Sequence, residues 1–392
     1  MKIIFCVILL SSLFFIGTGT QANRVTEQRN DKLGVYLQVN FEDYIEESKR
    51  WIKDNRAFIT EDHVLEIALN SPYELKPNLI STRGVLLVHG LSDSPYSFID
   101  IAKSLKQQGL LVRTILLPGH GSKPADLMLP TIEDWQLLIK HHTQLLAKEV
   151  DELWLGGFST GANLVTSAAI ANPDINGLLL FSPAFASQRQ LVSLAPLAAN
   201  FIDWADIDEE NNITRYNSLA MNGAALYYQS AQIVQEELKN TVYSKPVFVM
   251  ISGDDSVIDT NLVREYFSTQ FSHPGSRMVW YGSNGPKGDR VSQFDMILPE
   301  SRISNGSHMG VLYSPDNPLY GKKGTIRICS NGQPENLEEK CNQGMDVWFS
   351  SWGYRSPNKV HARLTWNPYF KESMNIMQGV MNNSIGRDNN EN

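Results

Sequence analysis

Six short runs of mostly apolar residues, separated by segments with helical periodicity, constrain the fold of this chain more than any other feature. The runs are residues 84–88, 111–117, 153–155, 177–181, 246–251 and 278–281. Strands that are apolar throughout and alternate with helices form parallel sheets with both faces covered. The sequence therefore predicts an α/β fold with a mostly parallel central sheet flanked by helices.

Segments outside this alternation of strands and helices are expected to form further helices, a further strand and a cap. Residues 41–52 carry apolar side chains at helical spacing, whereas residues 64–69 resemble a strand. A further helix is expected to begin at Thr131, whose side chain can cap it together with Asp134. Residues 184–243 are mixed and mostly helical, which favours a cap over the sheet. Some apolar residues of this cap would suit an acyl or aromatic substrate, but we expect most to form the cap's own core: Leu191, Leu194, Leu197, Phe201, Trp204, Tyr227 and Tyr228.

The first 22 residues have the pattern of a secretory signal peptide. Lys2 is their one charge, residues 3–16 are uncharged and apolar, and small or polar residues follow. This run is shorter than the roughly 20 apolar residues of a membrane span. We expect export, to the periplasm or the medium, with an uncleaved membrane anchor as the main alternative. Outside this segment the chain has two cysteines, Cys329 and Cys341, and an even pair in an exported chain predicts a disulfide.

The charge of the chain excludes one class of partner. Its 34 Lys and Arg stand against 42 Asp and Glu, for a formal net charge of −8, and no basic cluster is present. Nucleic-acid binding is therefore not expected, because neutralising phosphates requires clustered basic side chains. No residue spacing resembles a metal site, and we expect no metal or organic cofactor. The sequence leaves the oligomeric state open.

A glycine-flanked serine lies where chemistry is expected. The motif Gly157-Phe-Ser-Thr-Gly161 follows the strand 153–155 and precedes an Ala-rich helix, residues 162–171. A nucleophilic serine needs a tight strand-to-helix turn that raises its hydroxyl clear of the sheet, and flanking glycines permit that turn. The motif alone is weak, and an incidental serine in a Gly-rich turn is the alternative. Its position between strand and helix favours Ser159 as a nucleophile.

Two backbone amides are expected to form an oxyanion hole. One is the N–H of Thr160, at the start of the helix, where the helix dipole favours negative charge. The second comes from the loop after the strand 84–88, with the N–H of Leu91 as the expected donor. His89 in that loop precedes the serine, and we interpret it as shaping the loop.

The acid and the base should follow the serine in the order Ser, Asp, His. Asp254 and Asp255 come directly after the strand 246–251, and we prefer Asp255 because it stands two residues before an apolar pair that turns the loop back to the core. Asp254 stays an alternative. His308 follows the strand 278–281 and is the expected base, in preference to His273 and His361.

At these motifs the chain resembles the α/β-hydrolases, in particular the branch of monoacylglycerol lipases and small carboxylesterases. The resemblance rests on residues 84–90, 117–121, 157–161, 253–255 and 307–308. It implies Ser159 as nucleophile, Asp255 as acid, His308 as base, and Leu91 and Thr160 as oxyanion donors. Residues 41–380 also resemble a group of exported bacterial hydrolases, including the run at 314–321. The chain departs from the compact lipases beyond residue 321, where the tail holds the cysteine pair.

The resemblance implies a serine hydrolase that cleaves small-molecule acyl esters, with contact to lipid or a membrane surface as a further expectation. Two alternatives stay open. One is an aminopeptidase or amidase, whose carboxylates would come from the acidic cap residues Asp206, Asp208, Glu209 and Glu210. The other is a non-catalytic binding protein on the same fold. The expected organisation is a signal peptide (1–22), an N-terminal extension (23–80), a hydrolase core (81–320) with its cap (184–243), and a C-terminal extension (321–392).

Overall fold

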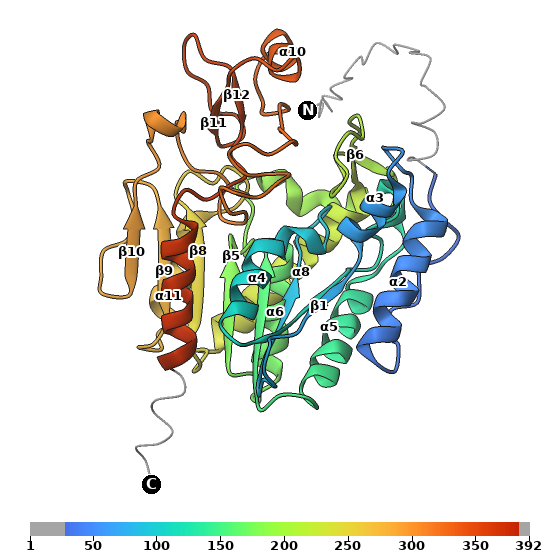
Figure 1. Cartoon of the computed structure of the whole chain (residues 1–392), viewed down its shortest axis with the longest axis vertical. Helices are drawn as coiled ribbons and strands as arrows, with labels where there is room; N and C mark the ends of the chain where they lie inside the picture. Colours follow the sequence, from blue (N-terminus) through green and yellow to red (C-terminus); the bar gives the residue numbers. More distant parts are fainter. Residues whose placement is uncertain (1–27, 384–392) are drawn as a thin grey trace, which may run out of the picture.

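The computed structural model describes residues 28–383, so the expected signal peptide lies outside the described residues. An eight-stranded sheet forms the centre of the molecule (Figure 1). Its strands, in spatial order, are β1 (Tyr73–Leu75), β3 (Leu111–Ile115), β2 (Arg83–Val88), β4 (Glu152–Phe158), β5 (Gly177–Phe181), β8 (Val247–Ser252), β9 (Arg277–Tyr281) and β10 (Val291–Phe294). Only β1 runs antiparallel to its neighbour. The predicted α/β class is confirmed.

Helices cover both faces of this sheet, which explains why its strands are apolar throughout. In β8, Val247, Val249 and Ile251 pack into one hydrophobic cluster, and Phe248 and Met250 pack into the other. The first cluster contains residues of α2 (Phe41–Asn55), α5 (Ile132–Leu146), α6 (Thr160–Ala171), α8 (Met221–Asn240) and α9 (Thr260–Thr269). The second contains residues of η1 (Pro95–Phe98), α4 (Ile99–Gln107) and α11 (Phe370–Asn383).

The helix predicted from Thr131 is confirmed, but the strand predicted at residues 64–69 is wrong. Thr131 caps α5 through a reciprocal capping box with Asp134. Residues 64–69 belong to the helix α3 (His63–Asn70), whose first turn is capped by the Asp62 side chain. Its buried residues, Glu66, Leu69 and Asn70, lie at helical rather than alternating spacing. The strand that pairs with β3 is β1, a few residues further on.

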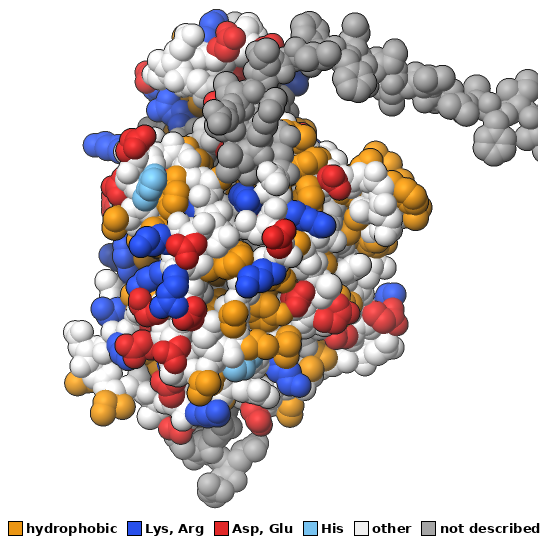
Figure 2. Space-filling view, turned by 90° about the vertical axis from the view of Figure 1, so that its right-hand side faces the viewer, with side chains coloured by type: hydrophobic (Ala, Val, Ile, Leu, Met, Phe, Trp, Pro, Cys, Tyr) orange, Lys and Arg blue, Asp and Glu red, His pale blue; other side chains and the backbone are white. Residues whose placement is uncertain are grey.

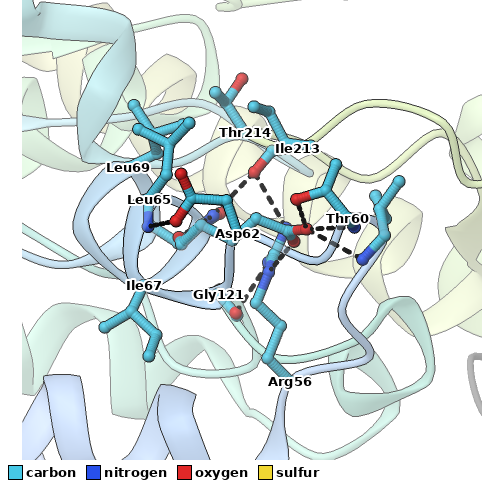
Figure 3. A network of polar contacts seen from close by, with 12 residues as sticks. Arg56, Thr60, Asp62, Leu65, Ile67, Leu69, Gly121, Ile213 and Thr214 are labelled. Carbon is cyan, nitrogen blue, oxygen red and sulfur yellow. Dashed lines mark hydrogen bonds and ion pairs between the residues drawn. The ribbon is translucent and has the colours of Figure 1, made fainter.

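A buried ion pair connects α2 and α3 to more distant loops (Figure 3). Arg56 lies 2.8 Å from the Glu66 carboxylate and also donates to the carbonyls of Gly121 and Ile213. The other Glu66 oxygen accepts from the backbone of Ile59 and from Thr60. Both charged side chains are almost fully buried, and apart from their mutual bond their hydrogen bonds are with neutral groups. The N-terminal helices are thereby joined to the segment around Ile213.

Short elements fill residues 184–220, before α8. They are η3 (Gln190–Leu194), α7 (Ala195–Ala198), β6 (Trp204–Asp206) and β7 (Leu219–Ala220). Four apolar side chains here, Leu191, Leu194, Leu197 and Phe201, are 56–80% exposed. Our interpretation of these four as cap core is therefore wrong: η3 and α7 are too short to bury all sides of their own residues. Trp204 and Tyr227 do pack against the first core cluster.

The C-terminal segment forms a small layer over one end of the sheet (Figure 1). It contains α10 (Glu335–Asn342) and the parallel pair β11 (Trp348–Ser350) and β12 (His361–Arg363). The predicted disulfide between Cys329 and Cys341 is present and is buried with Val347, Val360 and Ala362. The chain then returns to the sheet as α11.

The surface agrees with the charge pattern of the sequence. On the face shown in Figure 2, basic and acidic side chains are interspersed, with smaller hydrophobic groups between them. Within residues 28–383, every helix is too short or too polar to cross a bilayer. Two further short helices, η2 (Pro124–Met128) and η4 (Pro299–Ser301), complete the described elements.

Candidate active site

Ser159 lies at a sharp turn between β4 and α6. Its backbone has φ 54° and ψ −118°, a region that a non-glycine residue enters only when the surrounding structure holds it there. A Cβ at Gly157 would collide with the backbone of Gly161, and one at Gly161 would collide with the carbonyl of Val88. The two glycines are therefore required sterically. The turn lifts the Ser159 hydroxyl above the carboxyl end of the sheet.

A continuous hydrogen-bonded chain joins Ser159 to a histidine and an aspartate. His308 Nε2 lies 3.0 Å from Ser159 Oγ, and His308 Nδ1 lies 2.6 Å from Asp255 Oδ2. The ionised carboxylate accepts, so Nδ1 carries the proton and Nε2 accepts from the serine hydroxyl. Ser159, Asp255 and His308 are each less than 10% exposed. This arrangement can deprotonate the serine and stabilise the imidazolium that results.

The two neighbouring aspartates after β8 differ in their partners. Asp255 uses its other oxygen, Oδ1, to accept from the backbone N–H groups of Val257 and Ile258, at 2.9 and 3.3 Å. Asp254 instead accepts from the N–H of Gly306, and burial raises its pKa. The backbone amides of the apolar pair that follows Asp255 thus fix the orientation of its carboxylate.

The two other histidines that were candidates for the base lie elsewhere in the structure. His273 Nδ1 accepts from the N–H of Gly275, near the end of the loop after α9. His361, in β12, contacts Ser304 Oγ at 3.3 Å. Neither joins the hydrogen-bonded chain at Ser159.

Two neutral histidines support the loop that carries Leu91. His89 Nε2 accepts from the N–H of Leu117, and His120 Nε2 accepts from the N–H of Ser92. Their rings meet edge to face at 4.8 Å. Burial lowers the pKa of His89 well below its ordinary value, and burial lowers that of His120 to about 4. His89 therefore shapes the loop, and His120 is a supporting residue that the sequence analysis missed.

The expected oxyanion donors are adjacent in the sheet. Leu91 follows β2 and Thr160 follows β4, and these two strands pair directly. The chain leaves β2 toward β3 on one side and returns to β4 on the other, so the carboxyl ends of β2 and β4 form a topological switch point, where ligands bind in such sheets. No loop or cap hydrogen bond within residues 28–383 uses the amide of Leu91 or of Thr160.

A cavity of about 470 Å³ lies between residues 206–217 and residues 325–363. It is lined mostly by polar groups, including Arg215, Trp352 and Arg363. Arg215 Nη1 lies 2.9 Å from Sδ of Met309, the residue after His308. Ser159, Asp255 and His308 do not line this cavity, but Arg215 connects its wall to the residue that follows His308. Sequence reasoning missed both arginines, because they are far apart in the chain and carry no motif. A larger groove along α5 and α6 contains none of the predicted site residues.

The buried Asp93 also lies near the histidine. Burial raises the pKa of Asp93 to about 6, and the positive charge of Arg215 opposes this shift. The acidic cap residues named for the aminopeptidase alternative do not converge on the serine. Asp206, Asp208 and Glu209 are exposed, while Glu210 accepts from the backbone N–H groups of Asn217 and Ser218.

Among residues 28–383, no three His, Cys, Asp or Glu side chains form a metal-binding group.

The sheet order, the strand-to-helix turn at Ser159 and its histidine–aspartate neighbours together define an α/β-hydrolase fold, and the chain is similar to the monoacylglycerol lipase and esterase-like branch. Residues 81–218 match the family described as serine aminopeptidase, S33. A thermostable monoacylglycerol lipase of Bacillus sp. (strain H-257) is 25% identical over 185 residues, which cover 45% of this chain and 71% of that protein.

Solved structures with similarity to the chain include lipolytic enzymes. A structure described under LipS and LipT, two metagenome-derived lipolytic enzymes, has 21% identity and a TM-score of 0.47, covering 53% of this chain and 86% of its own. A soluble variant of monoglyceride lipase from Saccharomyces cerevisiae has 14% identity and a TM-score of 0.46, covering 54% and 81%. The monoacylglycerol lipase of Paleococcus ferrophilus has 17% identity and a TM-score of 0.44, covering 57% and 88%.

Proposed function

We propose that this protein is a serine hydrolase that cleaves carboxylic esters through an acyl-enzyme on Ser159. The observation that carries the proposal is the hydrogen-bonded chain from Asp255 through His308 to Ser159. Ser159 Oγ attacks the ester carbonyl carbon while His308 Nε2 takes the hydroxyl proton. The amides of Leu91 and Thr160 bind the developing oxyanion. The carbon–oxygen bond to the alcohol then breaks, and His308 returns the proton to the alcohol.

Deacylation repeats these steps with water as the nucleophile. His308 takes a proton from the water, the hydroxide attacks the acyl carbon, and Ser159 regains its proton as the acid leaves. Asp255 holds the imidazole in the productive tautomer throughout. No step needs a metal or an organic cofactor.

The substrate class proposed is a small acyl ester, including lipid-like esters. The similarity to a monoacylglycerol lipase supports this choice. The exposed apolar side chains of Leu191, Leu194, Leu197 and Phe201 support contact of the cap with a lipid surface. We further propose that residues 1–22 direct export, which agrees with the disulfide between Cys329 and Cys341. In the proposed organisation, a core of residues 81–320 with its cap at 184–243 lies between the two extensions.

Labelling with a fluorophosphonate probe tests the nucleophile. Wild-type protein is expected to be labelled and to hydrolyse 4-nitrophenyl esters, and Ser159→Ala is expected to lose labelling and at least about 10³-fold in kcat. Labelling of Ser159→Ala at the wild-type level would contradict the assignment. A series of acyl chain lengths, run beside aminoacyl anilides, separates an esterase from an aminopeptidase.

The neighbouring aspartates provide a matched pair for the same assay. Asp255→Asn is expected to lower kcat by about 10³- to 10⁴-fold, because the histidine loses its orienting carboxylate. Asp254→Asn removes a carboxylate that contacts Gly306 instead, and should cost less than about 10-fold. The reverse order would assign the acid to Asp254.

A further inference from the structure

Two arginines from separate parts of the chain line the same cavity. Arg215 belongs to the segment before α8, and Arg363 ends β12 in the C-terminal layer. Both are half-buried and line the cavity of about 470 Å³. Arg215 contacts Met309, and Arg363 lies near enough to Arg215 and Asp255 for both charges to act on its pKa. Arg215 thus lies against the residue that follows His308, and Arg363 lies within electrostatic range of Asp255.

Neither arginine has a carboxylate partner. Within residues 28–383, the arginines that form ion pairs are Arg50, Arg56, Arg83, Arg113 and Arg302. Arg215 Nε is buried without a hydrogen-bond partner, and the contact of Nη1 is to a thioether sulfur, a weak acceptor. Arg363 donates to neutral oxygens, Asn331 Oδ1 at 2.6 Å and the Ser330 carbonyl at 3.1 Å.

Two half-buried positive charges side by side are unfavourable without a counter-charge. Burial, together with the charge of Arg215, lowers the pKa of Arg363 to about 9, although Asp255 opposes the shift. The nearby acids do not neutralise the pair. Asp206, Asp208 and Glu209 line the cavity but are exposed. Glu338 also lines it and is half-buried, but burial and the charges of Asp208 and Glu335 raise its pKa, so it is not held by an arginine. Buried Asp93 lies within electrostatic range of Arg215 but forms no ion pair with it.

We infer that the cavity holds an anionic group, a carboxylate or a phosphate, on the non-reacting part of the ester substrate, between the guanidinium groups of Arg215 and Arg363. Guanidinium groups bind such anions through charge-assisted, often paired hydrogen bonds. This inference rests on the proposed esterase function and names its substrate class: esters with a negative charge close to the scissile bond.

Paired substrates that differ only in charge test this preference. In the first pair, mono(4-nitrophenyl) glutarate carries a negative charge on the acyl side, and its methyl ester is neutral. In the second pair, 4-acetoxybenzoate carries the charge on the alcohol side, and its methyl ester is neutral. In wild-type protein, kcat/KM for the anionic member of at least one pair is expected to exceed that of its neutral partner by about tenfold or more. Neutral partners that react equally well or better in both pairs would overturn the inference.

Substitution of the arginines tests the site itself. The double variant Arg215→Gln/Arg363→Gln should lose about tenfold or more of the anionic preference while it still cleaves the neutral methyl esters. The matched control is Arg355→Gln, because Arg355 is an exposed arginine of the same C-terminal segment that does not line the cavity. This control should keep the wild-type ratio within about twofold. If the double variant keeps the wild-type ratio of anionic to neutral kcat/KM, the arginines do not form the anion site.

A binding experiment separates this inference from the esterase proposal. Phenylacetate and its neutral analogue phenylacetamide are titrated into Ser159→Ala by calorimetry, with and without the two arginine substitutions. Phenylacetate should bind about tenfold or more tighter, and only when the arginines are present. Equal binding, or no binding of phenylacetate, counts against the anion site whatever the enzyme's activity. Absence of fluorophosphonate labelling and of neutral-ester hydrolysis in wild-type protein counts against the esterase proposal instead. Arg215→Lys/Arg363→Lys, which keeps both charges, serves if the Gln variant fails to fold.

Discussion

Single residues around Ser159 show how burial selects a protonation state. His89 and His120 accept hydrogen bonds from backbone amides, a role that only a ring nitrogen without a proton can fill. Because burial lowers both pKa values, these rings stay neutral while His308, whose Nδ1 faces a carboxylate, is arranged to gain a proton. The surroundings of each histidine thus decide whether it supports a loop or transfers a proton.

His120 should make stability depend on pH. Its pKa of about 4 lies below the ordinary value of 6.5, so stability is fully present above pH 6.5 and is lost as the pH falls through 4. Relative to His120→Gln, which does not titrate, wild type should lose about 3 kcal/mol between pH 6.5 and 4. Urea unfolding across this range measures the difference. His63→Gln, at an exposed histidine, is the control, and a wild-type difference that stays constant with pH would refute the prediction.

At the scale of elements, α2 and α3 connect the N-terminal part of the chain to the site. Arg56 reaches Gly121, next to His120, and Ile213, close to Arg215 (Figure 3). The backbone N–H of Tyr216 in turn donates to the carbonyl of Ser92. These contacts hold the segment that carries Arg215 against the loop that carries Leu91.

Removal of one member of the buried ion pair should be costly. Arg56→Met leaves the Glu66 carboxylate buried without its counter-charge, and we expect a loss of about 3–5 kcal/mol in the free energy of unfolding. Arg50→Met, which breaks the exposed pair with Glu47 on the same helix, should cost less than about 1 kcal/mol. Urea denaturation compares the two. Arg56→Met/Glu66→Gln should recover part of the loss, and equal costs for the two single variants would contradict this account.

At the scale of the whole molecule, the C-terminal segment forms one wall of the cavity that Arg215 also lines. It supplies Trp352 and Arg363 to the cavity and then returns through α11 to pack on the second face of the sheet. Its small cluster of buried residues is centred on the disulfide, so this layer has little apolar core of its own. A small layer of this kind depends on a covalent link for stability.

The disulfide between Cys329 and Cys341 should therefore contribute measurably. The two cysteines are 12 residues apart in the sequence. Closing a loop of this length lowers the conformational entropy of the unfolded chain, which raises its free energy by about 3 kcal/mol. Cys329→Ser/Cys341→Ser should lose up to about that amount in urea unfolding followed by tryptophan fluorescence. Reduction of wild type with dithiothreitol should reproduce the loss and leave the double variant unchanged. Identical unfolding curves for oxidised and reduced wild type would refute the prediction.

Local patterns in the sequence were sufficient for six of the eight strands of the sheet, but not for its two outer strands, β1 and β10. Continuous apolar runs predict buried parallel strands because both faces of the sheet are covered. Ser159, Asp255 and His308 each follow such a strand, so their side chains meet at one edge once the strands are parallel. The same local reasoning failed at α3: Glu66, Leu69 and Asn70 are buried through contacts with distant residues, which the run of apolar letters does not reveal.

The sequence by itself determined the α/β class, the turn at Ser159 and the cysteine pair, because each depends on local backbone constraints or on short spacing. Only the tertiary structure decided which aspartate faces His308, since neighbouring side chains point in different directions from one loop. It alone also placed Arg215 beside Arg363. Their proximity depends on how the cap and the C-terminal layer fold over the sheet, and contacts between such distant segments leave no periodic pattern in the sequence.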